Sequence, residues 1–74
     1  MKETLIKLIR KTTTDWESEI VSGTDLYKDL YFDELDSVEL LIELETKFNI
    51  TISDSEWEKC KTVQDVLDLI EKNI

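Results

Sequence analysis

The chain has 74 residues, of which 41% are hydrophobic, and 18 acidic residues against nine basic ones give it a net charge of −9. Such a charge opposes binding to nucleic acid, and no apolar run approaches the ~18 residues of a membrane span. The absence of histidine and the single cysteine exclude histidine-based triads, histidine zinc sites and an internal disulfide. With no signal-peptide pattern at its start, we expect one cytoplasmic, monomeric domain over residues 1–74.

The first predicted helix covers residues 2–13, and it ends where a run of β-branched threonines lowers helix propensity. Its apolar residues recur at helical spacing: Leu5, Ile6, Leu8 and Ile9. Residues 14–32 form a connection long enough to be functional in a compact domain. Its apolar side chains are expected to pack under the helices: Ile20, Val21, Leu26, Leu30 and Phe32.

The second helix is predicted between an N-cap at Asp33 and an end at Asn49. Six apolar residues cover one broad side of it, and Ser37 falls within the same arc: Leu35, Val38, Leu41, Ile42, Leu44 and Phe48. The opposite side is mostly acidic, with Asp36, Glu39, Glu43 and Lys47.

Two capping sequences predict the remaining helices. Ser53–Glu56 has the pattern of a capping box, with Ile52 and Trp57 as its hydrophobic staple, and it begins a short third helix. Thr62–Asp65 has a similar form and begins a last helix with apolar residues at helical spacing: Val63, Val66, Leu67, Ile70 and Ile74. The fold class is therefore all-α, a small four-helix bundle of three main helices and a short third helix.

The residues that catalysis or metal binding would need are missing. Cys60 is expected to be a core side chain rather than a nucleophile, because no histidine can activate it. Gly23 alone cannot form a glycine-rich phosphate loop. Calcium is the strongest small-ligand alternative, since Asp33, Glu34 and Asp36 lie close together, but no EF-hand loop is present. We expect neither an enzyme nor a metal site.

Three fragments, in order, resemble acyl carrier proteins: "DLYKDL" at residues 25–30, "DLYFDELDSVELLIELETKF" at 29–48 and "ITISDSEWEKCKTVQDVLDLI" at 50–70. The resemblance covers roughly residues 19–72. It implies a bundle of the acyl-carrier type, in which the serine of an Asp-Ser-Leu triplet at the start of the second helix carries 4′-phosphopantetheine. Asp33 and Leu35 match this triplet, but Glu34 stands at the serine position and cannot be modified in that way. Use of the prosthetic group by this chain is therefore in doubt.

Ser37 is the alternative attachment residue, because Asp36-Ser37-Val38 imitates the triplet one turn later. Its place in the apolar arc favours an inward, structural role instead. The sequence is compatible with Glu34 as a native, degenerate residue and as an engineered replacement.

The resemblance also implies an acyl pocket between the second and third helices. Six residues match its lining: Leu41, Leu44, Trp57, Cys60, Val66 and Leu69. Trp57 stands where the family commonly has a small residue, so it is expected to fill this pocket, to staple the third helix, or both. Whether the pocket is open beside Trp57 is not decided by the sequence.

A docking surface on the second helix is implied as well. It would contact basic patches of acyl-transfer, synthase or phosphopantetheinyl transferase enzymes through seven residues: Asp33, Leu35, Asp36, Val38, Glu39, Glu43 and Glu45. The leading hypothesis is an acyl-carrier-like domain of fatty acid, lipid or polyketide biosynthesis that docks without the usual attachment point. The alternatives are an active carrier modified at Ser37 and an acidic adaptor that carries nothing.

Overall fold

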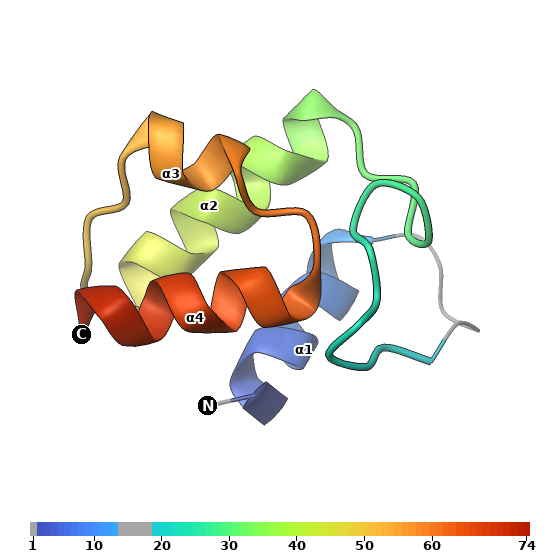
Figure 1. Ribbon diagram of the computed structural model, residues 1–74, viewed down its shortest axis with the longest axis horizontal. Coiled ribbons are helices and arrows are strands. Elements are labelled where there is room, and N and C mark those ends of the chain that lie inside the picture. The colour runs from blue at the N-terminus through green and yellow to red at the C-terminus, as the bar shows by residue number, and fades with distance from the viewer. Residues whose placement is uncertain (1, 14–18) are drawn as a thin grey trace.

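Four helices make up the regular structure of the computed structural model, which describes residues 2–13 and 19–74. They are α1 (Lys2–Thr12), α2 (Glu34–Phe48), α3 (Asp54–Glu58) and α4 (Val63–Asn73). The described ranges contain no β-strand, so the predicted all-α class with a short third helix is confirmed. In Figure 1, α3 lies above α4, α2 crosses behind them, and the described part of the long connection, residues 19–33, lies at the end of the molecule opposite the C-terminus.

The ends of α2 are fixed by local hydrogen bonds, as the sequence predicts. The Asp33 carboxylate accepts from the backbone N–H of Asp36 at 2.9 Å, and the Asp36 carboxylate accepts from the N–H of Asp33 at 3.3 Å. At the other end, Asn49 adopts a left-handed conformation with φ 53°, which closes the last turn. The exposed N-terminal turn of α2 therefore has a defined position.

The two later caps differ from each other. Thr62 and Asp65 form a complete capping box, and Asp65 also accepts from the N–H of Lys61 at 3.0 Å. The backbone hydrogen bond from Lys61, followed by the one from Thr62, has the largest effect on the pKa of Asp65 and holds it below its ordinary value of 3.8. At Ser53 only half of the predicted box forms: its hydroxyl accepts from the N–H of Glu56, while the Glu56 carboxylate accepts from that hydroxyl rather than from the backbone.

The core draws on all four helices and on the long connection. Four of the five connection residues predicted to be inside are buried: Ile20, Leu26, Leu30 and Phe32. The prediction is wrong for Val21, which is 47% exposed. Val21 begins a tight turn in which its N–H donates to the hydroxyl of Thr24 at 2.9 Å, and its side chain faces solvent.

The buried side of α2 is narrower than the apolar arc in its sequence. It runs through Ser37, Leu40 and Leu44, with Leu41 and Phe48 half-buried. Leu40, which helical periodicity does not place on the apolar side, is fully buried. Three members of the predicted apolar side instead face solvent: Leu35, Val38 and Ile42. The other elements cover only part of this helix, so part of its apolar arc stays uncovered.

Backbone hydrogen bonds attach the long connection to the segment between α3 and α4. Leu26 N–H donates to Lys61 C=O at 2.8 Å, and Val63 N–H donates to Thr24 C=O at 3.0 Å. These bonds place Tyr27, the residue after Leu26, beside the N-terminal half of α2. The connection is thus part of the site described below.

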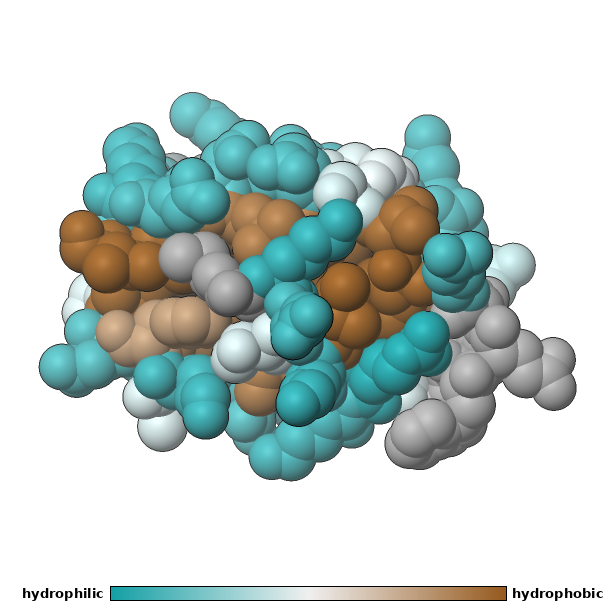
Figure 2. Space-filling model, turned by 90° about the horizontal axis from the view of Figure 1, so that it is seen from below, coloured by the Kyte–Doolittle hydropathy of each residue, from teal (hydrophilic) through white to brown (hydrophobic). Residues whose placement is uncertain are grey.

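The face on the side of α1 and α4 carries apolar side chains between hydrophilic ones, as Figure 2 shows.

Within the described part of the chain, no helix combines the length and the apolar character needed to cross a membrane.

Candidate functional site

A hollow of about 790 Å³ lies between the end of the long connection, the N-terminal half of α2, and α3. Eleven residues line it: Tyr27, Phe32, Asp33, Glu34, Ser37, Val38, Leu41, Asp54, Trp57, Glu58 and Lys61. It includes both candidate attachment positions, so its chemistry bears on each of them.

Ser37 is held inside this hollow by two aromatic side chains. The indole N–H of Trp57 donates to Ser37 Oγ at 2.8 Å, and the Tyr27 hydroxyl lies 3.1 Å from the same oxygen. Ser37 is only 8% exposed and Trp57 only 7%. A buried hydroxyl needs such partners, since an unpaired one is costly. The Ser37 hydroxyl is therefore a structural link between α2, α3 and the connection.

The rim of the hollow is strongly acidic. Asp33, Glu34, Asp54 and Glu58 contribute four carboxylates, against the single ammonium group of Lys61. That ammonium lies 5.2 Å from the centre of the Tyr27 ring, over its face. A phosphate placed here would meet like charge on most sides, which raises the free energy of binding an anion.

Glu34 is the first residue of α2, and it is exposed. Negative charge at this position interacts favourably with the N-terminal end of the helix dipole. Its carboxylate has no hydroxyl that could be linked to a phosphate. Of the two candidate positions, Glu34 thus offers no hydroxyl, and the Ser37 hydroxyl is buried and hydrogen-bonded.

The three outward apolar residues of α2 form a stripe along the helix, called here the α2 stripe. Leu35 is 74% exposed, Ile42 57% and Val38 46%. Carboxylates border it on both sides, since at 100° per residue Glu34 and Glu45 fall on one flank and Glu39 on the other. Large apolar side chains left uncovered beside carboxylates are typical of a protein-binding surface.

Most of the acidic residues predicted for docking have partners inside the chain. Asp33 and Asp36 cap α2, Glu45 accepts from the N–H of Ile52 at 2.9 Å, and Glu43 pairs with Lys11 of α1 at 3.4 Å. Glu39 is exposed on the helix surface.

The structure distributes the six predicted acyl-pocket residues over different places. Leu41 and Trp57 line the 790 Å³ hollow, whereas Cys60 and Leu69 line a separate hollow of about 300 Å³ between α3 and α4. Leu44 and Val66 are fully buried in the core. That these six line one acyl pocket stays a prediction, and the residues are not gathered around a single hollow.

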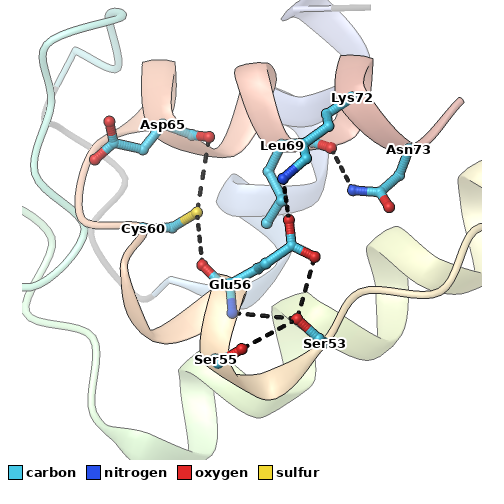
Figure 3. Close-up of polar contacts among 8 residues, drawn as sticks. All are labelled: Ser53, Ser55, Glu56, Cys60, Asp65, Leu69, Lys72 and Asn73. Carbon is cyan, nitrogen blue, oxygen red and sulfur yellow. Dashed lines mark hydrogen bonds and ion pairs between the residues drawn. The ribbon is translucent and has the colours of Figure 1, made fainter.

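Cys60 lies between α3 and α4, where its thiol donates to the carbonyls of Glu56 and Asp65, both at 3.7 Å (Figure 3). Burial raises the pKa of this thiol to about 11, so it stays protonated at neutral pH. Glu56 also pairs with Lys72 at 2.9 Å, and this hydrogen bond lowers the pKa of Glu56. The surroundings of Cys60 agree with the core role expected for it.

Five residues of the site were not predicted from the sequence: Tyr27, Phe32, Asp54, Glu58 and Lys61. The signal that could have found Tyr27 is Ser37 itself, since a hydroxyl within an apolar arc requires a polar partner from elsewhere. Over the part of the chain that the structure describes, no group of three or more His, Cys, Asp or Glu side chains is arranged to hold a metal ion.

Comparison with known proteins gives consistent matches. A family profile described as a phosphopantetheine attachment site matches residues 3–70. The acyl carrier protein of Coprothermobacter proteolyticus is 40% identical over 70 residues, which cover 95% of this chain and 85% of that protein. The acyl carrier protein of Thermosynechococcus vestitus is 49% identical over 55 residues, covering 74% of this chain and 68% of that protein.

Solved structures match as well. A candidate acyl carrier protein of Mycobacterium tuberculosis superimposes with a TM-score of 0.89 at 31% identity, covering 96% of this chain and 95% of that one. The acetyl form of the actinorhodin acyl carrier protein of Streptomyces coelicolor gives a TM-score of 0.71, over 97% and 87% of the two chains. At 23% identity, the second match shows only that the two chains share a fold.

Proposed function

Since this chain belongs to the acyl carrier protein family, we propose that it docks to acyl-processing enzymes through α2 but carries no phosphopantetheine. Members of this family are carriers and not enzymes, and phosphopantetheine is the prosthetic group that the family implies. In this proposal Glu34 occupies the attachment position. The setting is fatty acid, lipid or polyketide biosynthesis in the cytoplasm.

The exposure of the α2 stripe is the observation that supports docking through α2. Leu35, Val38 and Ile42 leave apolar surface in water on a helix whose other side fills the core. Burying such surface against a partner is favourable. The bordering carboxylates select a partner with a basic rim and speed its association.

Two observations support the absence of the prosthetic group. Glu34 offers a carboxylate at the exposed start of α2, and the acidic rim of the hollow disfavours an anion. The alternative attachment at Ser37 would require breaking its hydrogen bonds to Trp57 and Tyr27 and drawing the hydroxyl to the surface. The geometry therefore favours a carrier fold that has kept its docking helix and lost its attachment point.

The missing attachment is tested by incubating the unaltered chain with coenzyme A and a broad-specificity phosphopantetheinyl transferase. Intact mass is expected to stay unchanged, because no exposed hydroxyl occupies the start of α2. The Ser37→Ala chain is the matched control. A gain of one phosphopantetheine unit that disappears in Ser37→Ala would show that Ser37 is the attachment residue and would overturn the proposal.

Charge reversal on α2 tests whether the chain docks through this helix. Glu39→Lys is expected to weaken binding to the same transferase about three- to tenfold, since a bordering carboxylate would become a repulsive cation. Binding is measured by calorimetry at low salt, and the loss should shrink as salt is added. Glu71→Lys on α4 makes the same change in net charge at an exposed position away from α2. If both variants bind equally well, the surface around the α2 stripe is not where the enzyme docks.

A further inference from the structure

Tyr31 holds a backbone conformation that normally favours glycine. Its φ is 58°, in the left-handed region where a Cβ meets the neighbouring carbonyl. The residues on either side explain the conformation, since Leu30 is 3% exposed and Phe32 6%. A left-handed residue turns the chain so that both neighbours enter the core. The fold thus requires this backbone geometry, but it does not require a tyrosine to provide it.

Asn49 is the other non-glycine residue with positive φ in the described ranges, and it has a local explanation. It ends α2 as the C-cap, where asparagine is a favoured substitute for glycine. Tyr31 has no equivalent explanation, because tyrosine is not favoured in this region and its side chain is 77% exposed. Burial of the Tyr31 side chain itself therefore does not compensate for the strained backbone. Strain kept at an exposed residue is a recognised mark of function.

The position of Tyr31 suggests which function. It precedes the Asp33 N-cap by two residues, and four Cα steps separate it from Leu35, a span of at most about 15 Å. It therefore lies at the end of α2 where the α2 stripe begins. The exposed Tyr31 ring and the exposed stripe residue Leu35 are therefore close together at this end of the helix.

We propose that Tyr31 is an anchor of the docking surface, inserting its ring into the apolar centre of a partner enzyme whose rim is basic. This inference rests on the docking function proposed above. Tyrosine suits an anchor, because it supplies a large contact area and loses few rotamers when bound. Glu34 and Glu39, both exposed beside the same stripe, supply the complementary charge for a rim of lysine and arginine.

Tyr31→Gly separates the two roles of the residue. Glycine relieves the left-handed strain, so the midpoint of thermal unfolding is expected to rise by about 3 °C. Loss of the ring is expected to weaken binding to a broad-specificity phosphopantetheinyl transferase about tenfold. Tyr31→Phe keeps the ring and should bind within about twofold of the unaltered chain. Calorimetric binding and thermal melting are measured on the same full-length chains.

Matched controls make the outcomes distinct. Asn49→Gly changes the other left-handed residue, at the far end of α2, and should leave binding unchanged. Unchanged binding by Tyr31→Gly, together with weakened binding by Leu35→Ala, would overturn the role of Tyr31 and leave the docking function standing. Unchanged binding by Leu35→Ala and Glu39→Lys would overturn the docking function itself. A fall in the melting temperature of Tyr31→Gly would mean that tyrosine causes no net loss of stability at this position, which also contradicts the inference.

Discussion

Trp57→Ala is expected to lower the free energy of unfolding by about 3–5 kcal/mol, the usual cost of removing a large aromatic side chain from a core. Trp57 is 7% exposed and packs within the cluster of buried side chains. Its loss leaves a cavity and also removes the hydrogen-bond donor of Ser37. A small domain has limited stability to lose, so this variant is expected to be largely unfolded at 25 °C.

Trp57→Phe is the milder variant that separates packing from hydrogen bonding. It keeps most of the apolar ring and removes the indole N–H, so the expected cost is about 1–2 kcal/mol, because Ser37 loses one of its two hydrogen-bond partners. Ser37→Ala removes the acceptor instead and should cost a similar amount. Because the two residues share one interaction, the double variant should cost clearly less than the sum of the single ones.

Urea unfolding followed by far-ultraviolet circular dichroism measures the four variants and the unaltered chain. This probe does not depend on tryptophan fluorescence, which the substitutions alter. Strict additivity in the double variant would mean that the 2.8 Å contact between Trp57 and Ser37 contributes no coupling. A cost below about 1 kcal/mol for Trp57→Ala would contradict the packed position of the indole ring.

The contacts of Ser37 illustrate what sequence can and cannot predict. Its inward direction follows from helical periodicity, a local property. Its partners do not, because Tyr27 lies 10 residues away and Trp57 20 residues away, on elements whose arrangement is set by the whole fold. Local interactions also explain why the helix ends could be predicted. The caps at Asp33 and Thr62 act within four residues, and both were predicted from sequence.

The exposed side of α2 shows the same limit of prediction from sequence. Helical periodicity groups Leu35, Val38 and Ile42 with the apolar residues, but only the packing of the other elements decides which of these are covered. Leu40, at the edge of the acidic side by periodicity, is fully buried for the same reason. The left-handed conformation of Tyr31 is likewise imposed by burial of its neighbours, and nothing in the residue itself indicates it.

Glu34→Ser is expected to change the chain from unmodified to fully modified under the same transferase conditions. The substitution places a hydroxyl at the first, exposed position of α2. The unpaired N–H groups of a first helical turn favour a phosphate there, and one carboxylate leaves the acidic rim. Intact mass should increase by one phosphopantetheine unit, as the serine oxygen takes this group from coenzyme A and the nucleotide part leaves.

Two control chains locate the modification. Glu34→Ala removes the same carboxylate but offers no hydroxyl, so its mass should not change. Glu34→Ser combined with Ser37→Ala should still gain one unit, because Ser37 serves only as a structural link in this proposal. Failure of Glu34→Ser to gain mass, while the same chain still binds the transferase, would mean that position 34 is not the attachment position. If Glu34→Ser neither binds the transferase nor gains mass, the result contradicts the proposed docking surface. The unaltered chain would then be related to acyl carriers by fold and descent, but not by the enzymes that it contacts.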